Sequence, residues 1–225
     1  MKNEQPFSNP IQAPCKERPF VLRTVMPKIS DEARETRRSQ ILDAAWRCFD
    51  KEGLHATTMQ HIIGASGLSA GAVYSYFKSK DDLIFAAVTT SLERLRVLLG
   101  EAIQRQPPRS AAELIALLLP VITTFAVRDG YDLRRIALLG WSEAQRNRRL
   151  RATMQTYYAA FRENLSRLAI GWGPARSPSD ADAIAKLLLS VLLGTVVQSA
   201  LMEDASAEDI AHGFSLLSVS SAAIS

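Results

Sequence analysis

Cysteine, glycine and proline are scarce in this sequence, and no pattern in it favours β-structure. Its 225 residues include two cysteines, 11 glycines and 10 prolines. No run alternates apolar with polar residues as a half-buried strand would. Long segments rich in Ala, Leu and Arg instead carry apolar residues at helical spacing. The composition is 47% hydrophobic and 22% charged, which is typical of a soluble globular protein. We therefore expect an all-α fold.

Two cysteines cannot supply a disulfide framework. Cys48 falls on the helical face that also carries Ile41, Ala45 and Phe49, while Cys15 lies in an irregular leader. Reduced thiols in a cytoplasmic protein explain both residues. We interpret Cys48 as a core thiol, with a redox sensor as the alternative.

Catalytic and metal-binding motifs are also missing. The histidines His55, His61 and His212 are scattered without metal-ligand spacing, and neither a nucleophile motif nor a glycine-rich phosphate loop is present. The most apolar run, from Leu187 to Met202, is shorter than the ~20 residues of a membrane span and contains polar residues. We expect no catalytic site, metal, cofactor or membrane contact, and we interpret the apolar run as a buried helix.

Net charge by itself does not indicate a nucleic-acid partner. The formal charge is +4, and residues 31–90 contain seven Lys and Arg against eight acidic residues. Locally, however, no acidic residue occurs from His55 to Lys80, and Lys78 and Lys80 close that segment. This local pattern is typical of a surface that contacts phosphates.

Helix starts are marked where a Ser or Thr is followed three residues later by an acid or amide, because the two residues cap each other's backbone amides. Five such pairs occur: Thr57/Gln60, Ser79/Asp82, Ser110/Glu113, Ser177/Asp180 and Ser206/Asp209. With the apolar periodicity they predict about nine helices. These lie near residues 31–52, 58–65, 69–76, 80–104, 111–128, 132–146, 148–170, 178–202 and 206–220.

Residues 53–83 have the layout of a helix-turn-helix, with two short helical patterns joined by a turn at Gly67. Ser69 is a natural N-cap of the second helix, and Ala70, Gly71 and Ala72 keep its outer face small enough to approach base edges. Other side chains would contact phosphates, which positions the protein without specifying sequence. They are Arg37, Arg38, Thr57, Thr58, Tyr74, Tyr76 and Lys80. The alternative is a helix pair that does not touch DNA, with the YSYF segment as a core aromatic cluster.

The run from Arg38 to Leu83 resembles the DNA-binding domain of the TetR family of transcriptional regulators. The matching segments are ILDAA, F followed by G, ATTM, the IxxxSGLSxGxVYxYF core and SKDDL. One departure is Ile63-Gly64, where the family commonly has alanine and a polar or charged residue. The resemblance implies sequence reading at Ala70 and Ala72. It implies further DNA contacts at Thr57, Thr58, Ser69, Gly71, Tyr74, Tyr76 and Lys80.

The same resemblance implies a homodimer on a palindromic double-stranded DNA operator, with the two recognition helices in successive major grooves. It also implies a larger C-terminal domain that dimerises and binds a small-molecule effector, and most members repress transcription. We therefore expect a cytoplasmic repressor in three parts. Residues 1–29 form a flexible arm, within which Met26 is an alternative translation start; residues 30–80 form the DNA-binding domain; residues 81–225 form the effector-binding and dimerisation domain.

Residues 90–225 lack a comparable motif, so the effector site is predicted from pattern alone. Most aromatic residues outside the DNA-binding domain lie between residues 125 and 161, with Arg134, Arg135 and Glu143 as additional polar groups. An apolar pocket with a few polar groups would suit an apolar or aromatic effector. The predicted pocket residues are Phe125, Tyr131, Trp141, Gln145, Met154, Tyr157, Tyr158 and Phe161. Each of them could instead belong to an ordinary core.

The segment from Asp180 to Met202 is apolar nearly all round, so a helix there needs more than one neighbour. In a dimer, the last two helices of each subunit would form a four-helix interface, with Gly194 at the crossing. The predicted interface residues are Leu187, Leu188, Val191, Leu192, Gly194, Thr195 and Gln198. The alternative is a helix buried wholly within one subunit.

The leading hypothesis is an operator-bound dimer that an effector releases. A shift of the helix that starts at Lys80 would move the recognition helices away from the ~34–36 Å spacing of successive major grooves. One alternative is a DNA-bound scaffold without an effector, and another is a helical small-molecule carrier or enzyme. Native mass spectrometry for a copurified ligand, with and without operator DNA, distinguishes these possibilities.

Overall fold

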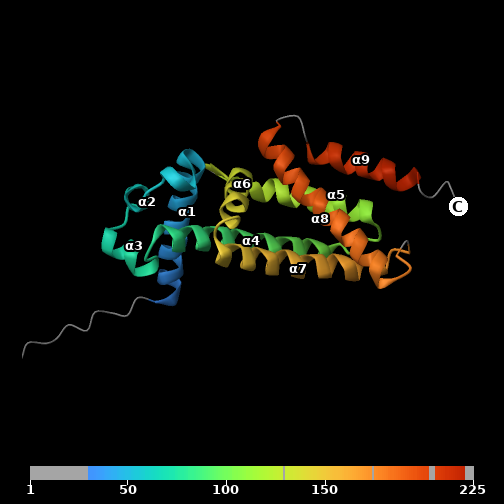
Figure 1. The fold of residues 1–225 in the computed structure, drawn as a ribbon, viewed down its shortest axis with the longest axis horizontal. Coiled ribbons are helices and arrows are strands. Elements are labelled where there is room, and N and C mark those ends of the chain that lie inside the picture. The colour runs from blue at the N-terminus through green and yellow to red at the C-terminus, as the bar shows by residue number, and fades with distance from the viewer. Residues whose placement is uncertain (1–29, 129, 174, 203–205, 221–225) are drawn as a thin grey trace, which may run out of the picture.

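The computed structural model describes residues 30–128, 130–173, 175–202 and 206–220. The predicted arm, including Cys15 and Met26, lies outside these described residues. Helices form most of the described chain, which confirms the predicted all-α class (Figure 1). The helices are α1 (Asp31–Ala56), α2 (Met59–Ser66), α3 (Ala70–Tyr76), α4 (Lys80–Arg105), α5 (Ala111–Ala126), α6 (Leu133–Ala144), α7 (Arg148–Ile170), α8 (Pro178–Leu201) and α9 (Ala207–Ser220).

Four of the five predicted capping pairs begin a helix as expected. The hydroxyls of Ser79, Ser110, Ser177 and Ser206 each accept a hydrogen bond from the backbone amide three residues later, at 3.0–3.1 Å. Each cap satisfies an amide that has no partner within its helix. These local contacts explain why the observed starts of α4, α5, α8 and α9 lie within one residue of the predicted ones.

A short hairpin replaces the predicted end of α5. The predicted helix over 111–128 stops at Ala126, and β1 (Val127–Arg128) pairs antiparallel with β2 (Tyr131–Asp132). Gly130 in the turn has a φ of 88°, a left-handed conformation that glycine adopts without steric cost. Asp132 then caps α6, since its carboxylate accepts a hydrogen bond from the Arg134 amide at 2.8 Å. The predicted helix over 132–146 is correspondingly shorter at both ends.

The helices form two connected groups (Figure 1). One hydrophobic cluster joins α1, α2, α3 and the start of α4, and it also includes Phe125 of α5 and Leu133 and Ile136 of α6. A second cluster joins α5, α7, α8 and α9. α4 belongs to both groups as one continuous helix and lies alongside α7. α1 packs against α4 and α6, and it thereby connects the helices around the turn at Gly67 to the larger helical body.

Cys48 is half-buried on α1 and packs against the first cluster. Burial, more than the nearby Glu52 carboxylate, raises the pKa of its thiol. A raised pKa reduces the thiolate fraction and with it the reactivity that a redox sensor requires. The structure therefore supports the core-thiol interpretation.

α8 is the one helix among the described residues with the length and hydropathy to cross a membrane. Leu188 and Leu192 are buried in the second cluster with the side chains of α5 and α7, as in the core helix of a globular protein. Only 22% of its most apolar stretch is buried, however, and Leu187 is 57% exposed. The alternative of a helix buried wholly within one subunit therefore does not fit the described residues.

Candidate DNA-binding surface and effector cavity

The turn between α2 and α3 is fixed by backbone conformation and by α1. Gly67 ends α2 with a φ of 67° in the left-handed region. The Gln40 side-chain amide of α1 donates to the Ser66 carbonyl at 2.8 Å, and the Ser66 hydroxyl accepts from the Leu68 amide at 3.2 Å. These contacts hold α3 at a defined orientation to α1.

α3 buries one face and exposes the other. Val73 and Phe77 anchor it in the first hydrophobic cluster. Ser69 caps its start by accepting from the Ala72 amide at 3.3 Å. Ala70 and Gly71 lie exposed, Ala72 is half-buried, and Tyr74 is 41% exposed. The start of this exposed face carries only Ala70, Gly71 and Ala72, so it has the small side chains that a close approach to base edges requires.

Two predicted phosphate contacts lie at the starts of α2 and α4, the helices before and after α3. Thr58 is exposed and caps α2 by accepting from the His61 amide at 3.2 Å. Lys80 begins α4, and its Nζ donates to the carbonyl of His55, three residues before Thr58, at 3.0 Å. Tyr76 is half-buried. Of these three predicted contacts, Thr58 is therefore the most exposed.

The two predicted arginines of α1 differ in their surroundings. Arg37 is exposed and free to approach phosphate. Arg38 is half-buried, lies 3.4 Å from a Glu35 carboxylate oxygen and covers the ring of Phe77 at 5.8 Å from its centroid. Arg38 thus also helps to hold Phe77 in place.

Thr57 does not occupy the surface position that the sequence predicts. It is fully buried, and its hydroxyl donates to the carbonyls of Gly53 at 2.7 Å and Cys48 at 3.1 Å. Thr58, not Thr57, therefore caps α2, and the predicted Thr57/Gln60 pair and phosphate contact of Thr57 are wrong. The sequence does not separate the two adjacent threonines, because either could cap a helix that starts near residue 59.

Replacing Thr57 with valine should destabilise the protein without altering its DNA-binding surface. Valine keeps the shape but removes the hydroxyl donor that the Gly53 and Cys48 carbonyls share, while the Thr57 amide still donates to Gly53, so the loss should be about 1 kcal/mol of unfolding free energy. Chemical denaturation at fixed protein concentration measures the loss. Thr57→Ser, which retains the hydroxyl, is the control and should lose less. A Thr57→Val protein as stable as the wild type would contradict this assignment.

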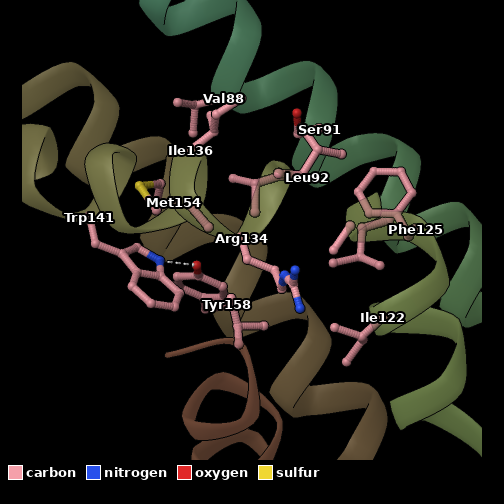
Figure 2. A pocket seen from close by; sticks show the side chains of 15 residues that line it. Val88, Ser91, Leu92, Ile122, Phe125, Arg134, Ile136, Trp141, Met154 and Tyr158 are labelled. Carbon is pink, nitrogen blue, oxygen red and sulfur yellow. Dashed lines mark hydrogen bonds between the residues drawn. The ribbon is translucent and has the colours of Figure 1, made fainter. Parts of the chain in front are cut away.

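A cavity of about 90 Å³ lies among α4, α5, α6, α7 and α8 (Figure 2). Apolar side chains form most of its wall, and the Trp141 ring nitrogen donates to the Tyr158 hydroxyl at 2.7 Å. The lining residues are Val88, Ser91, Leu92, Leu95, Ile122, Phe125, Ala126, Leu133, Arg134, Ile136, Ala137, Trp141, Met154, Tyr158 and Val196. Trp141, Met154 and Tyr158 also line an open groove of about 370 Å³ outside the cavity.

The structure brings together half of the predicted pocket residues. Phe125, Trp141, Met154 and Tyr158 line the cavity. The other four lie elsewhere: Tyr131 stacks against Trp46 and donates to Asp43, Gln145 lines the outer groove, and Tyr157 and Phe161 line a smaller hollow against α4. Adjacent residues of a helix point about 100° apart, so nearness in sequence does not place them in one cavity.

Sequence reasoning missed the contribution of α4. Val88, Ser91, Leu92 and Leu95 form one wall of the cavity, at the helical spacing that already marks the apolar face of this segment. Arg134, predicted only as an accompanying polar group, lies in the wall itself. Arg135 instead lies 3.5 Å from Asp50 of α1, and Glu143 pairs with Arg146.

Part of the cavity wall also belongs to the first hydrophobic cluster, which contains α1. Leu133 and Ile136 of α6 line the cavity and form part of the first hydrophobic cluster. The hairpin and α6 contact α1 through Tyr131 and Arg135, while Arg146 after α6 contacts His55. α4 carries cavity-lining Val88 eight residues, or about 12 Å along the helix, from Lys80. The cavity and the helix-turn-helix are therefore joined by side-chain contacts to α1 and by the continuous helix α4.

The predicted interface residues of α8 fall on two faces. Leu188, Leu192 and Thr195 are buried within the protomer. Leu187 and Gln198 are exposed, and Val191, Gly194 and Gln198 line an open groove of about 400 Å³ between α8 and α9. On α9, Leu216 and Leu217 are 60% and 77% exposed. An apolar surface therefore extends over both helices, at the end of the molecule away from α2 and α3 (Figure 1).

Comparison with known proteins agrees with this geometry. Residues 41–87 match the model of bacterial regulatory proteins of the tetR family, and residues 121–213 match that of the BetI-type transcriptional repressor, C-terminal. YfiR of Bacillus subtilis, an uncharacterized HTH-type transcriptional regulator, is 30% identical over 188 residues, which is 82% of this chain and 89% of the relative. BetI of Rhizobium meliloti, an HTH-type transcriptional regulator, is 28% identical over 78% of this chain and 83% of its own.

A solved structure shares the fold. The crystal structure of a transcriptional regulator from Saccharomonospora viridis, in complex with choline, superimposes with a TM-score of 0.63 at 19% identity. The match covers 80% of this chain and 93% of that one. The relatives are transcriptional regulators and not enzymes. The helix-turn-helix, the helical body and these matches together show that the chain is a DNA-binding transcriptional regulator of the TetR family.

Proposed function

We propose that this protein is a cytoplasmic repressor that binds a palindromic operator as a homodimer and releases it when a small molecule enters the cavity. The observation that carries the proposal is the position of α4 and α6. Both helices line the cavity, and both contact the helices of the DNA-binding unit. We retain the division at residue 80, with the DNA-binding domain before it and the effector-binding and dimerisation domain after it.

The cavity supports a small effector. Its volume is below the ~300–1,000 Å³ of pockets for drug-sized ligands, so a larger ligand would extend into the outer groove past Trp141 and Tyr158. The choline held by the Saccharomonospora viridis regulator supports a small organic molecule as the class of effector. Phe125, Trp141, Met154 and Tyr158 are the predicted residues that we retain as effector contacts.

Release of the operator is expected because cavity-lining residues also belong to the first hydrophobic cluster. A ligand that separates Leu92 from Ile136 would move α4 relative to α6, and α4 carries Lys80 at its start. Movement of α4 and α1 would change the distance between the two recognition helices of a dimer. Since operator binding requires ~34–36 Å between them, the bound and released states differ in affinity for both ligand and DNA.

The apolar surface of α8 and α9 supports the homodimer. Leu187, Leu216 and Leu217 would be buried if the two helices packed against the same pair of a second subunit, as a twofold interface requires. Gly194 has no atom within 4 Å of the position of a Cβ, so the surface there is open to close approach. We assign the dimer contacts to Leu187, Val191, Gly194 and Gln198 and leave Leu188, Leu192 and Thr195 to the protomer core.

Tyr74→Phe and Lys80→Ala should each weaken operator binding in distinguishable ways. Loss of the tyrosine hydroxyl should lower affinity roughly tenfold, by removing hydrogen bonds to charged phosphates. Loss of the lysine should also reduce the slope of log affinity against log salt by about one per subunit. Titration of a genomically selected operator at two salt concentrations measures both effects. Arg105→Ala, at the far end of α4, is the control, and unchanged affinity in both test variants would contradict the docking.

A further inference from the structure

Few polar groups lie along the effector cavity, and those that do are mainly hydrogen-bond donors. Of the described residues that line it, none is Asp or Glu, and Arg134 alone carries a charge. The Ser91 hydroxyl donates to the Ala87 carbonyl within α4 at 3.0 Å, so its hydrogen is already engaged. The donors that remain belong to Arg134 and Tyr158.

Arg134 is held by a carboxylate that does not line the cavity. Its Nε and Nη2 donate to the Asp132 carboxylate at 3.0 Å and 2.7 Å, and Asp132 also caps the start of α6. These bonds raise the pKa of Arg134, so the guanidinium stays cationic. Its Nη1 has no acceptor among the described residues, so both N–H groups of Nη1 remain available as donors. Figure 2 shows the guanidinium among the side chains that surround the cavity.

Tyr158 adds a donor from the neighbouring helix. Its hydroxyl oxygen accepts from Trp141 Nε1, so the hydroxyl hydrogen remains available to a ligand. Burial raises the pKa of this hydroxyl, which keeps it protonated. The rest of the wall, including Leu92, Ile122 and Phe125, is apolar.

Resting on the proposed function, we infer that the effector is a small apolar molecule that carries a carboxylate, and not a cation. A carboxylate can accept from Arg134 Nη1 and from the Tyr158 hydroxyl, and hydrogen bonds from guanidinium to carboxylate are among the strongest available. A quaternary ammonium group cannot accept a hydrogen bond from either donor. It would also lie close to the Arg134 guanidinium, which carries the same charge. The aromatic faces of Trp141 and Tyr158 would be its only compensation in this wall.

Three molecules of one shape and different charge test the inference. They are 3,3-dimethylbutanoate, the uncharged 3,3-dimethylbutan-1-ol and choline, each titrated into the purified full-length protein by calorimetry. We expect the carboxylate to bind at least about tenfold more tightly than the alcohol, and choline to bind most weakly. Arg134→Gln should remove the advantage of the carboxylate while leaving affinity for the alcohol within about twofold. The order of the three affinities for the wild-type protein tests the inference even if the Arg134→Gln variant is unstable.

The outcomes separate this inference from the proposed function. Choline as the tightest ligand, or equal affinity for the carboxylate and the alcohol, would overturn the inference and leave an effector cavity in place. An Arg134→Gln protein that keeps the full preference for the carboxylate would also overturn it. Absence of binding by all three molecules, with no copurified ligand in native mass spectrometry, would contradict the effector role itself and this inference with it.

Discussion

Gly71→Glu should abolish specific operator binding while the protein remains folded. Gly71 lies on the exposed face of α3, and a Cβ there would meet no atom within 4 Å. The substitution can therefore be accommodated, and in a helix glutamate is favoured over glycine by a few tenths of a kcal/mol or more. On DNA, a carboxylate would stand between the helix and the bases, close to phosphates of the same charge.

The expected loss is large because a homodimer carries the change twice. Each disrupted set of base contacts costs about 1–3 kcal/mol, so two sets should lower affinity by roughly 100-fold or more. Electrophoretic mobility shift with the operator measures the loss, and circular dichroism verifies the fold. Gly100→Glu is the matched control, because Gly100 also lies in a helix with open space around it but at the far end of α4. If Gly71→Glu bound operator as tightly as Gly100→Glu, the exposed face of α3 would not be the reading surface.

Leu187→Glu combined with Leu217→Glu should convert the dimer into monomers. The two leucines are 57% and 77% exposed in the protomer, so the charges cost little in the isolated chain. In a dimer they would be buried without partners, which opposes association strongly. Light scattering after size-exclusion chromatography should report half the mass of the wild-type protein.

Loss of the dimer should also weaken operator binding by about 100-fold or more. Two half-sites bound by linked domains gain from a high effective concentration, and separate monomers lose that gain. Ile170→Glu is the matched control, since Ile170 is 58% exposed at the end of α7, outside α8 and α9. A dimeric double variant would place the interface on another surface, and a monomeric double variant with wild-type operator affinity would show that dimerisation is not needed for binding.

Local patterns predicted most of the secondary structure and which face of α3 is exposed. Ser69, Ser79, Ser110 and Ser177 cap helices where expected, because a cap depends on residues only three apart. Ala70 and Gly71 are exposed and Val73 is buried, since helical periodicity separates these faces. Such interactions lie within one or two turns, so the sequence carries them directly.

Tertiary packing decided the features that periodicity leaves ambiguous. Thr57 and Thr58 both suit a cap, and only the packing of α1 against α2 buries the first of them. The hairpin after Ala126 depends on Gly130 and on two residues in each strand, too few to form an alternating pattern. No local signal distinguished these outcomes.

The sequence by itself determined most of the helices, most of their caps and the helix-turn-helix pattern, whereas the tertiary structure decided what surrounds the cavity and which face of α8 is free. Tyr157 and Tyr158 are adjacent and chemically alike, yet Tyr158 alone lines the cavity. Leu187 and Leu188 are likewise adjacent, and one is exposed while the other is buried. A helix that is apolar nearly all round has no polar face to orient it, so only its neighbours determine where each side chain points.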